Sequence, residues 1–162
     1  MSREMNPGTT YEIDIREVAA QPMAAVTQSA LPAEIGKTLI AGLDKVYAVL
    51  RLQGVAPLGC NVGLYRDGGD GRVSVCSGVE TPHVIEAEGD VAAAATPAGR
   101  AAATTHWGPY EELGAAHRAI AGWIAARGLA SRLNWEVYGD WADDATQRRT
   151  DVFHLIEEVA QS

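Results

Sequence analysis

The feature of this sequence that most constrains its fold is an internal repeat. Residues 34–36 (Glu-Ile-Gly) recur at 112–114 (Glu-Leu-Gly), and residues 63–67 (Gly-Leu-Tyr-Arg-Asp) recur at 136–140 (Glu-Val-Tyr-Gly-Asp). The first copy spans about residues 11–80 and the second about 91–158. A unit that buries one sheet face under one helix must combine with its copy to complete a core. The repeat therefore predicts two similar halves that join in one domain.

The hydrophobic pattern predicts a strand, a helix and two further strands in each copy. Helices are expected to begin at Pro32 and Pro109, because proline is favoured in the first helical turn, and to end at Gly54 and Gly128. Apolar residues at spacings of three and four support both helices. The expected strands cover residues 11–18, 23–29, 59–66, 72–79, 91–95, 99–107, 134–140 and 150–158.

These elements predict an α+β fold of duplicated β-α-β-β units. We expect a pseudo-twofold antiparallel sheet that carries two helices, and a central cleft between the halves as the natural pocket. Residues 11–158 are expected to form this single domain, and residues 1–10 a short flexible tail.

Charge and composition exclude several classes of function. The chain has 162 residues and a formal net charge of −8, which disfavours binding to a phosphate backbone through a basic face. No apolar run is long enough for a membrane span, and the N-terminus lacks the apolar core of a signal peptide. We expect a cytoplasmic protein whose two cysteines, Cys60 and Cys76, are reduced thiols.

Glu136 is the most informative candidate for a binding site. It lies within a predicted strand, between Trp135 and Val137, where a carboxylate either points to solvent or is buried at a cost that a ligand can offset. Strand alternation places Glu136 and Tyr138 on one sheet face and Trp135 on the other. The matched position in the first repeat is Gly63, so a carboxylate is not a general requirement of the fold.

The aromatic residues near Glu136 have two interpretations. Trp107, Tyr110, Tyr138 and Phe153 either belong to the core or line a pocket in which rings and a carboxylate hold a flat cationic ligand. The four histidines, His83, His106, His117 and His154, lack metal-ligand spacing, and we expect each to be structural and no metal to be bound. The sequence contains no nucleophile elbow, phosphate loop or dinucleotide fingerprint, and no cofactor is expected.

Several segments together resemble the GyrI-like small-molecule-binding domain, the effector-binding domain of AraC-type and MerR-type multidrug-sensing regulators. The resemblance covers about residues 11–158 and is strongest over 97–156. The segments that carry it are 97–101 (Pro-Ala-Gly-Arg-Ala), 106–113 (His-Trp-Gly-Pro-Tyr-Glu-Glu-Leu), Trp123, 135–138 (Trp-Glu-Val-Tyr) and 150–156 (Thr-Asp-Val-Phe-His-Leu-Ile).

The resemblance implies a duplicated, SHS2-like fold with a pocket between the halves. It also implies that Glu136 meets cationic, lipophilic ligands and that Trp107, Tyr110 and Phe153 line their site, to which strand alternation adds Tyr138. The first expected function is sequestration or sensing of a hydrophobic, cationic or aromatic compound. An alternative is a hydrolase of cyclopropane-bearing or similar electrophiles that uses Glu136, Tyr110 and Tyr138 as acid–base groups. A third is a gyrase-modulator-like inhibitor with a protein partner. No DNA-binding segment accompanies the domain, so direct contact with nucleic acid is not expected.

Overall fold

The computed structural model describes residues 10–158. The flexible tail predicted over residues 1–10 therefore lies, apart from residue 10, outside the described residues. The described chain has two α-helices, each preceded by a short 3-10 turn that contains or follows the predicted proline. The helices are α1 (Ile35–Gln53) and α2 (Leu113–Ala125), and the strands are β1 (Asp14–Val18), β2 (Pro22–Ala30), β3 (Asn61–Gly69), β4 (Arg72–Glu80), β5 (Ala92–Ala95), β6 (Gly99–Trp107), β7 (Leu129–Ala130), β8 (Leu133–Tyr138), β9 (Arg149–Leu155) and β10 (Glu157–Glu158).

Eight of these strands form one antiparallel sheet whose order is symmetric about its centre. The order is β1-β6-β9-β8-β3-β4-β2-β5, so the first half contributes β3-β4-β2 and the second half contributes β8-β9-β6 in mirror order. The two outer strands are exchanged, because β1 pairs with β6 of the second half and β5 pairs with β2 of the first. The predicted α+β fold, with one antiparallel sheet and two helices, is confirmed.

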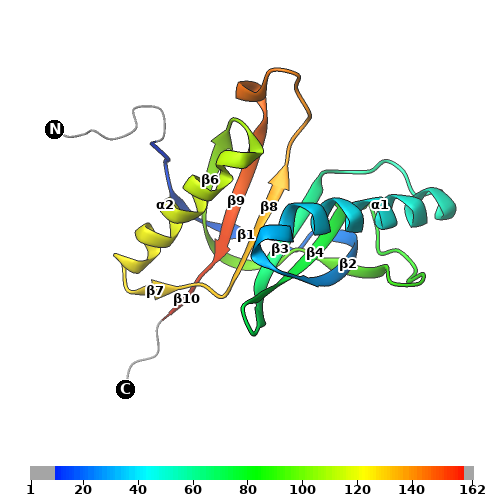
Figure 1. The fold of residues 1–162 in the computed structure, drawn as a ribbon, viewed down its shortest axis with the longest axis horizontal. Helices are drawn as coiled ribbons and strands as arrows, with labels where there is room; N and C mark the ends of the chain where they lie inside the picture. The colour runs from blue at the N-terminus through cyan, green and yellow to red at the C-terminus, as the bar shows by residue number, and fades with distance from the viewer. Residues whose placement is uncertain (1–9, 159–162) are drawn as a thin grey trace.

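Both helices cover the same face of the sheet, and each covers only its own half. Helix α1 packs on β2 and β4 through Val46 and Leu50, and α2 packs on β6 and β9 through Ala116 and Ile120 (Figure 1). The two central strands, β3 and β8, lie between the helices. The helix-facing side chains of these two strands therefore form the floor of the space between the halves.

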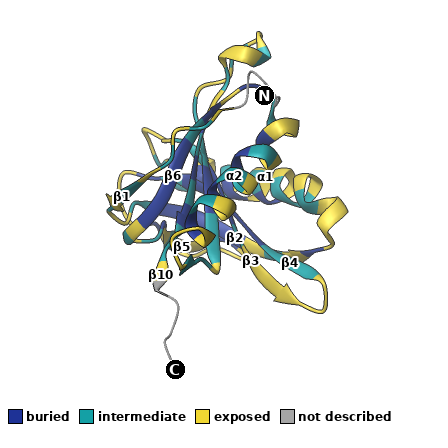
Figure 2. Cartoon of the chain, turned by 90° about the vertical axis from the view of Figure 1, so that its left-hand side faces the viewer, coloured by how far each residue is buried: buried dark blue, intermediate teal, exposed yellow. Residues whose placement is uncertain are grey.

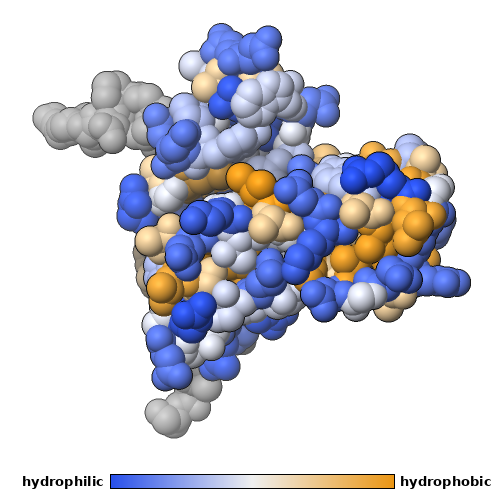
Figure 3. Space-filling view, turned by 45° about the vertical axis from the view of Figure 1, so that its right-hand side comes forward, coloured by the Kyte–Doolittle hydropathy of each residue, from blue (hydrophilic) through white to orange (hydrophobic). Residues whose placement is uncertain are grey.

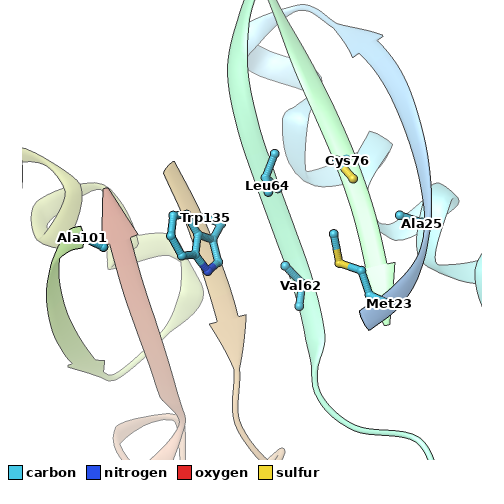
Figure 4. Close-up of a cluster of buried hydrophobic side chains, with 7 residues drawn as sticks. All are labelled: Met23, Ala25, Val62, Leu64, Cys76, Ala101 and Trp135. Carbon is cyan, nitrogen blue, oxygen red and sulfur yellow. The ribbon is translucent and has the colours of Figure 1, made fainter. Parts of the chain in front are cut away.

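The opposite face of the sheet holds a separate apolar cluster. Its members come from strands of both halves and include Val62 and Leu64 of β3, Met23 of β2 and Trp135 of β8 (Figure 4). Figure 2 shows that buried residues concentrate in the sheet strands, whereas the outward side of the helices is exposed. Each central strand thus has one core face and one cavity face, which matches its alternation of residue types.

Helix α1 ends where the sequence predicts, with Gly54 as its C-cap, whereas α2 ends at Ala125, three residues before the predicted Gly128. Gly54 and Gly128 have φ angles of 65° and 70°, a left-handed conformation that glycine adopts without strain. Strand β7, which pairs with β10, was not predicted from the sequence, and the strand expected over 150–158 is divided at Ile156 into β9 and β10. No helix in residues 10–158 is long and apolar enough to cross a membrane.

The two cysteines are free and lie apart on the β3–β4 hairpin. Cys76 pairs with Leu64, whereas the carbonyl of Cys60 accepts from the backbone N–H of Glu80, four positions further along the ladder. Four strand residues span about 13 Å, roughly twice the Cα separation that a disulfide bridges. The two thiols are therefore too far apart to pair within the chain.

The packing of α1 on the sheet depends on Gly42. A Cβ atom at this position would lie 2.6 Å from Cβ of Ser77 on β4, so the helix must move away from the sheet to accept one. We expect Gly42→Ala to lower the free energy of unfolding by about 1–3 kcal/mol through overpacking. Gly122→Ala in α2 is the matched control, because nothing lies within 4 Å of the added atom. The control should gain up to about 1 kcal/mol from helix propensity, as measured by urea unfolding. Equal effects of both substitutions would contradict this account of the packing.

Candidate functional site

The floor of the site is built by two strand segments with the same pattern. The cavity-facing residues of β3 are Asn61, Gly63 and Tyr65, and those of β8 are Asn134, Glu136 and Tyr138. The strands pair antiparallel, with Gly63 directly opposite Glu136. The two positions matched by the sequence repeat therefore face each other across the centre of the sheet.

This register explains why one matched position is glycine. Residues that lie beside the symmetry centre are crowded, and the hydroxyls of Tyr65 and Tyr138 occupy the space next to Gly63. A Cβ atom on Gly63 would lie 2.5 Å from the hydroxyl oxygen of Tyr65 and 3.1 Å from that of Tyr138. The centre of the floor therefore holds one carboxylate, with one tyrosine from each half beside it.

The carboxylate of Glu136 is buried and hydrogen-bonded at both oxygens. The side chain is 8% exposed. Its Oε1 accepts from the hydroxyl of Tyr65 at 3.3 Å and from the hydroxyl of Tyr138, and its Oε2 lies 2.7 Å from Nε2 of His117. Because isolated buried carboxylates are strongly disfavoured, these three partners account for the presence of a carboxylate here.

Burial keeps the two floor tyrosines protonated. Loss of solvent is the main cause that raises the pKa of the Tyr65 hydroxyl and that of the Tyr138 hydroxyl, and the neighbouring charge of Glu136 raises both further. Both side chains are therefore hydrogen-bond donors at neutral pH. A hydroxyl with a raised pKa transfers its proton only to a strongly basic partner, which limits the acid chemistry available to these groups.

Two histidines extend the hydrogen-bonded group toward α2 and β9. Nδ1 of His117, on α2, lies 2.9 Å from Nε2 of His154, on β9. Burial first, and the nearby His117 second, lower the pKa of His154 to about 4. His154 is thus neutral at neutral pH. The side chains of Glu136, His117 and His154 form a continuous hydrogen-bonded chain.

A cavity of about 940 Å³ lies above this floor, between α1 and α2. Its α1 wall is apolar and includes Leu39, Ile40 and Leu43. Figure 3 shows hydrophobic side chains gathered over the part of the surface that α1 forms. The volume falls within the range of sites that hold drug-sized molecules.

A series of aromatic rings leads from the cavity rim to Glu136. Trp141, which is 64% exposed, lies 6.3 Å from Tyr110 between ring centroids, and Tyr110 lies edge-on to Tyr138 at 5.7 Å. The guanidinium of Arg148 stacks on Trp141 at 3.7 Å and holds this outermost ring. The rings form one wall along which a flat ligand can pack.

The structure brings together three of the five predicted site residues. Glu136, Tyr110 and Tyr138 line the cavity. Phe153 does not, because its register on β9 places it opposite Trp135 on the other sheet face, where the two rings stack at 5.0 Å. Trp107 lies at the end of β6, 57% exposed, beside Arg149 and outside the cavity. The prediction that Phe153 and Trp107 line the same cavity as Glu136 is therefore corrected.

Among the cavity residues that the sequence did not indicate, Tyr65, His117, His154 and Trp141 matter most to the site. Tyr65 is the repeat partner of Tyr138, so the Tyr-x-Asp match contained the signal that would have found it. His117 and His154 are missed because the histidines lack metal-ligand spacing, which predicts structural roles for them. Trp141 belongs to the aromatic cluster after Glu136, yet its loop position gave no indication of direction.

The described part of the chain contains no cluster of three metal-ligating side chains. His106, one of the four histidines, is buried and has structural partners, since its Nδ1 lies 2.9 Å from the Tyr11 hydroxyl and its Nε2 lies 3.1 Å from the Pro109 carbonyl. What the site offers chemically is one carboxylate, two hydroxyls, an imidazole pair and an apolar, ring-lined space.

The family follows from comparison with known proteins. The sequence profile of the GyrI-like small molecule binding domain matches residues 11–153. The chain belongs to the GyrI-like family. The resemblance noted in the sequence is thereby confirmed, and a comparison with curated proteins gives no match.

Several solved structures share the fold at low sequence identity. The EcmrR C-terminal domain superposes with a TM-score of 0.76 at 18% identity, over 93% of this chain and all of that one (100%). A hydrolase from Listeria innocua gives 0.64 at 12%, over 90% of this chain and 92% of that one. SAV2435 bound to tetraphenylphosphonium superposes with a TM-score of 0.63 at 14% identity, over 90% of this chain and 94% of that one.

The lowered pKa of His154 predicts a pH-dependent stability. Its folded value of about 4 lies below the ordinary 6.5, so the unfolded chain binds the proton more tightly. The contribution of neutral His154 to the free energy of unfolding is therefore complete above pH 6.5. It is lost as the pH falls from 6.5 toward the folded-state pKa of about 4, by on the order of 2 kcal/mol. We expect His154→Leu to remove this part of the pH dependence in urea unfolding. His83→Gln, at an exposed histidine, should leave it unchanged, and equal pH profiles for wild type and His154→Leu would contradict the prediction.

Proposed function

We propose that this GyrI-like domain binds a hydrophobic, cationic or aromatic small molecule in the cavity between its two halves. The observation that carries the proposal is the buried carboxylate of Glu136 on the floor of a largely apolar, ring-lined cavity. A cation that enters next to Glu136 gains a charge-assisted contact in a region with little water. Its apolar body gains contact with the aliphatic wall of α1 and with the rings of Tyr110 and Trp141.

The geometry favours selection by charge and shape over selection by a dense set of hydrogen bonds. Glu136 accepts bonds from Tyr65, Tyr138 and His117, so the ligand meets a carboxylate already fixed in place. Preorganisation of this kind reduces the entropy lost on binding. The remaining wall is mostly apolar and tolerates ligands of different outline, as expected for sequestration or sensing of several related compounds.

A relative of the same fold supports the choice of probe. SAV2435 has been solved with tetraphenylphosphonium, a lipophilic cation. The same cation suits the present cavity by volume, by the apolar character of α1 and by the charge of Glu136. Triphenylphosphine oxide supplies a neutral probe with similar rings.

Glu136→Gln tests the role of the carboxylate. The amide keeps the shape of the side chain and removes its charge, so we expect the affinity for tetraphenylphosphonium to fall about tenfold or more. Affinity for triphenylphosphine oxide should change by less than about threefold. Isothermal titration calorimetry at constant pH and ionic strength measures both.

A matched control separates the local charge from the net charge of the protein. Glu17→Gln changes the net charge by the same amount at an exposed position on β1, outside the cavity. Its affinity for both probes should equal that of wild type. Equal losses in Glu17→Gln and Glu136→Gln, or no loss in either, would exclude Glu136 as the ligand-binding carboxylate.

A second candidate function is hydrolysis of an electrophilic compound in the same cavity. It is favoured by the direct contact between Glu136 and the Tyr138 hydroxyl, and by the hydrolase of the same fold from Listeria innocua. In this scheme Glu136 activates water and Tyr138 or Tyr110 donates a hydrogen bond to the leaving group. The raised pKa of Tyr138 restricts this donation to strongly basic leaving groups.

Product analysis distinguishes turnover from binding. Mass spectrometry of cyclopropane-bearing compounds incubated with the protein should show a gain of one water only if hydrolysis occurs. Under that function, Glu136→Gln should abolish product formation with little change in substrate affinity. If these compounds remain unchanged while tetraphenylphosphonium and triphenylphosphine oxide bind as expected above, the result supports the binding function alone.

A further inference from the structure

His117 joins the floor carboxylate to a second histidine and belongs to neither the core nor the apolar wall. Its Nε2 lies 2.7 Å from Oε2 of Glu136, its Nδ1 lies 2.9 Å from Nε2 of His154, and 23% of its side chain is exposed in the cavity. The imidazole therefore has both nitrogens engaged and still contacts the space that a ligand would enter.

We propose that His117 is the built-in counter-cation of Glu136, and that a cationic ligand bound beside Glu136 displaces one proton from His117 to solvent. The proposal rests on the proposed binding function and extends it to the charge balance of the empty and occupied site. In the empty site the imidazolium neutralises the carboxylate. In the occupied site the ligand supplies the positive charge, and the neutral imidazole remains.

The hydrogen bonds permit both states without moving a heavy atom. When His117 is protonated at both nitrogens, Nε2–H donates to Glu136, Nδ1–H donates to His154, and neutral His154 carries its own proton on Nδ1. When His117 has lost a proton, its Nε2–H still donates to Glu136, and Nδ1 accepts from Nε2–H of His154. The two states differ by one proton on the pair and by the tautomer of His154.

The groups around His117 keep a fixed protonation state, so the exchangeable proton is assigned to His117. His154 on β9 is kept neutral by burial and by the adjacent imidazole, which lower its pKa to about 4. Tyr65 on β3 and Tyr138 on β8 remain protonated, since burial raises the pKa of each hydroxyl. Arg118 on α2 lines the cavity as a permanent cation, and the lining residues of α1 are uncharged.

The other half of the molecule supplies the natural comparison. His117 lies four residues after Leu113, and Leu39 lies four residues after the matched Ile35, so Leu39 is the equivalent position on α1. Both side chains line the cavity. His117→Leu thus places on α2 the residue that the fold already accepts on α1, and removes the proton-exchanging group. His117→Gln provides a polar variant in case the leucine variant does not fold.

The first experiment uses the protein without ligand. Nitrogen-15 NMR of the histidine rings should show His117 protonated at both nitrogens at about pH 5.5, and the Glu136→Gln variant should lose this second proton at the same pH. His83, which is exposed, serves as an internal reference. Single protonation of His117 in wild type throughout about pH 5.5–8 would overturn the proposal whether or not any ligand binds.

The second experiment counts protons released on binding. Calorimetric titration of tetraphenylphosphonium in two buffers of different ionisation enthalpy should show release approaching one proton at the lowest pH, and none in His117→Leu or His117→Gln. Affinity in wild type should rise toward about tenfold per pH unit in that range and become flat at higher pH. Triphenylphosphine oxide should release no proton, and His83→Gln should behave as wild type.

The outcomes separate this inference from the function on which it rests. Failure of tetraphenylphosphonium to bind overturns the binding function, while the NMR result still decides whether His117 is the counter-cation. Binding without proton release at any pH at which NMR shows the doubly protonated ring overturns the exchange. Release that persists in both His117 variants assigns the proton to another group and also overturns it.

Discussion

The register between β3 and β8 is the constraint on which the rest of the structure depends. It joins the two halves of the sheet and places the matched positions Gly63 and Glu136 opposite each other. At the centre of a nearly symmetric floor only one side chain has room, so one half carries glycine and the other carries the carboxylate. Tyr65 and Tyr138, which are matched between the halves, then converge on that carboxylate from both sides. The symmetry of the fold brings the two matched positions together, and because only one of them can carry a side chain, the centre of the site is asymmetric.

Burial of the carboxylate has consequences for the whole cavity. A buried carboxylate requires donors, and the fold supplies them from β3, from β8 and from α2. The helices cover the outer strands of the sheet and leave the central pair open, so the donors and Glu136 remain at the base of a space that a ligand can enter. The donors that make the carboxylate tolerable also hold its oxygens in a fixed position at the base of the cavity.

Predictions that depended on local pattern agree with the structure. Two-residue alternation correctly separated Glu136 and Tyr138 from Trp135, because successive strand side chains point to opposite faces wherever the strand lies. The prolines mark the turns before both helices, and Gly54 ends α1, whereas α2 ends three residues before Gly128. The prediction for Phe153 was wrong because it did not depend on local pattern alone. The face on which Phe153 lies depends on how β9 pairs with β8 after an irregular connection. The prediction for Trp107 was wrong because alternation alone does not fix the direction of a side chain at the end of a strand.

The sequence by itself indicated the two helices, the strands of the large sheet, the antiparallel α+β class and the face of the strand that carries Glu136. These properties follow from the spacing of apolar residues, turn residues and matched segments, which are local or repeated. Only the tertiary structure decided that His117 contacts Glu136, that His154 contacts His117, and that Trp107 and Phe153 lie elsewhere. Such meetings depend on strand register and on the position of each helix over the sheet, and these are fixed by packing between segments that the spacing of residues along the chain does not specify.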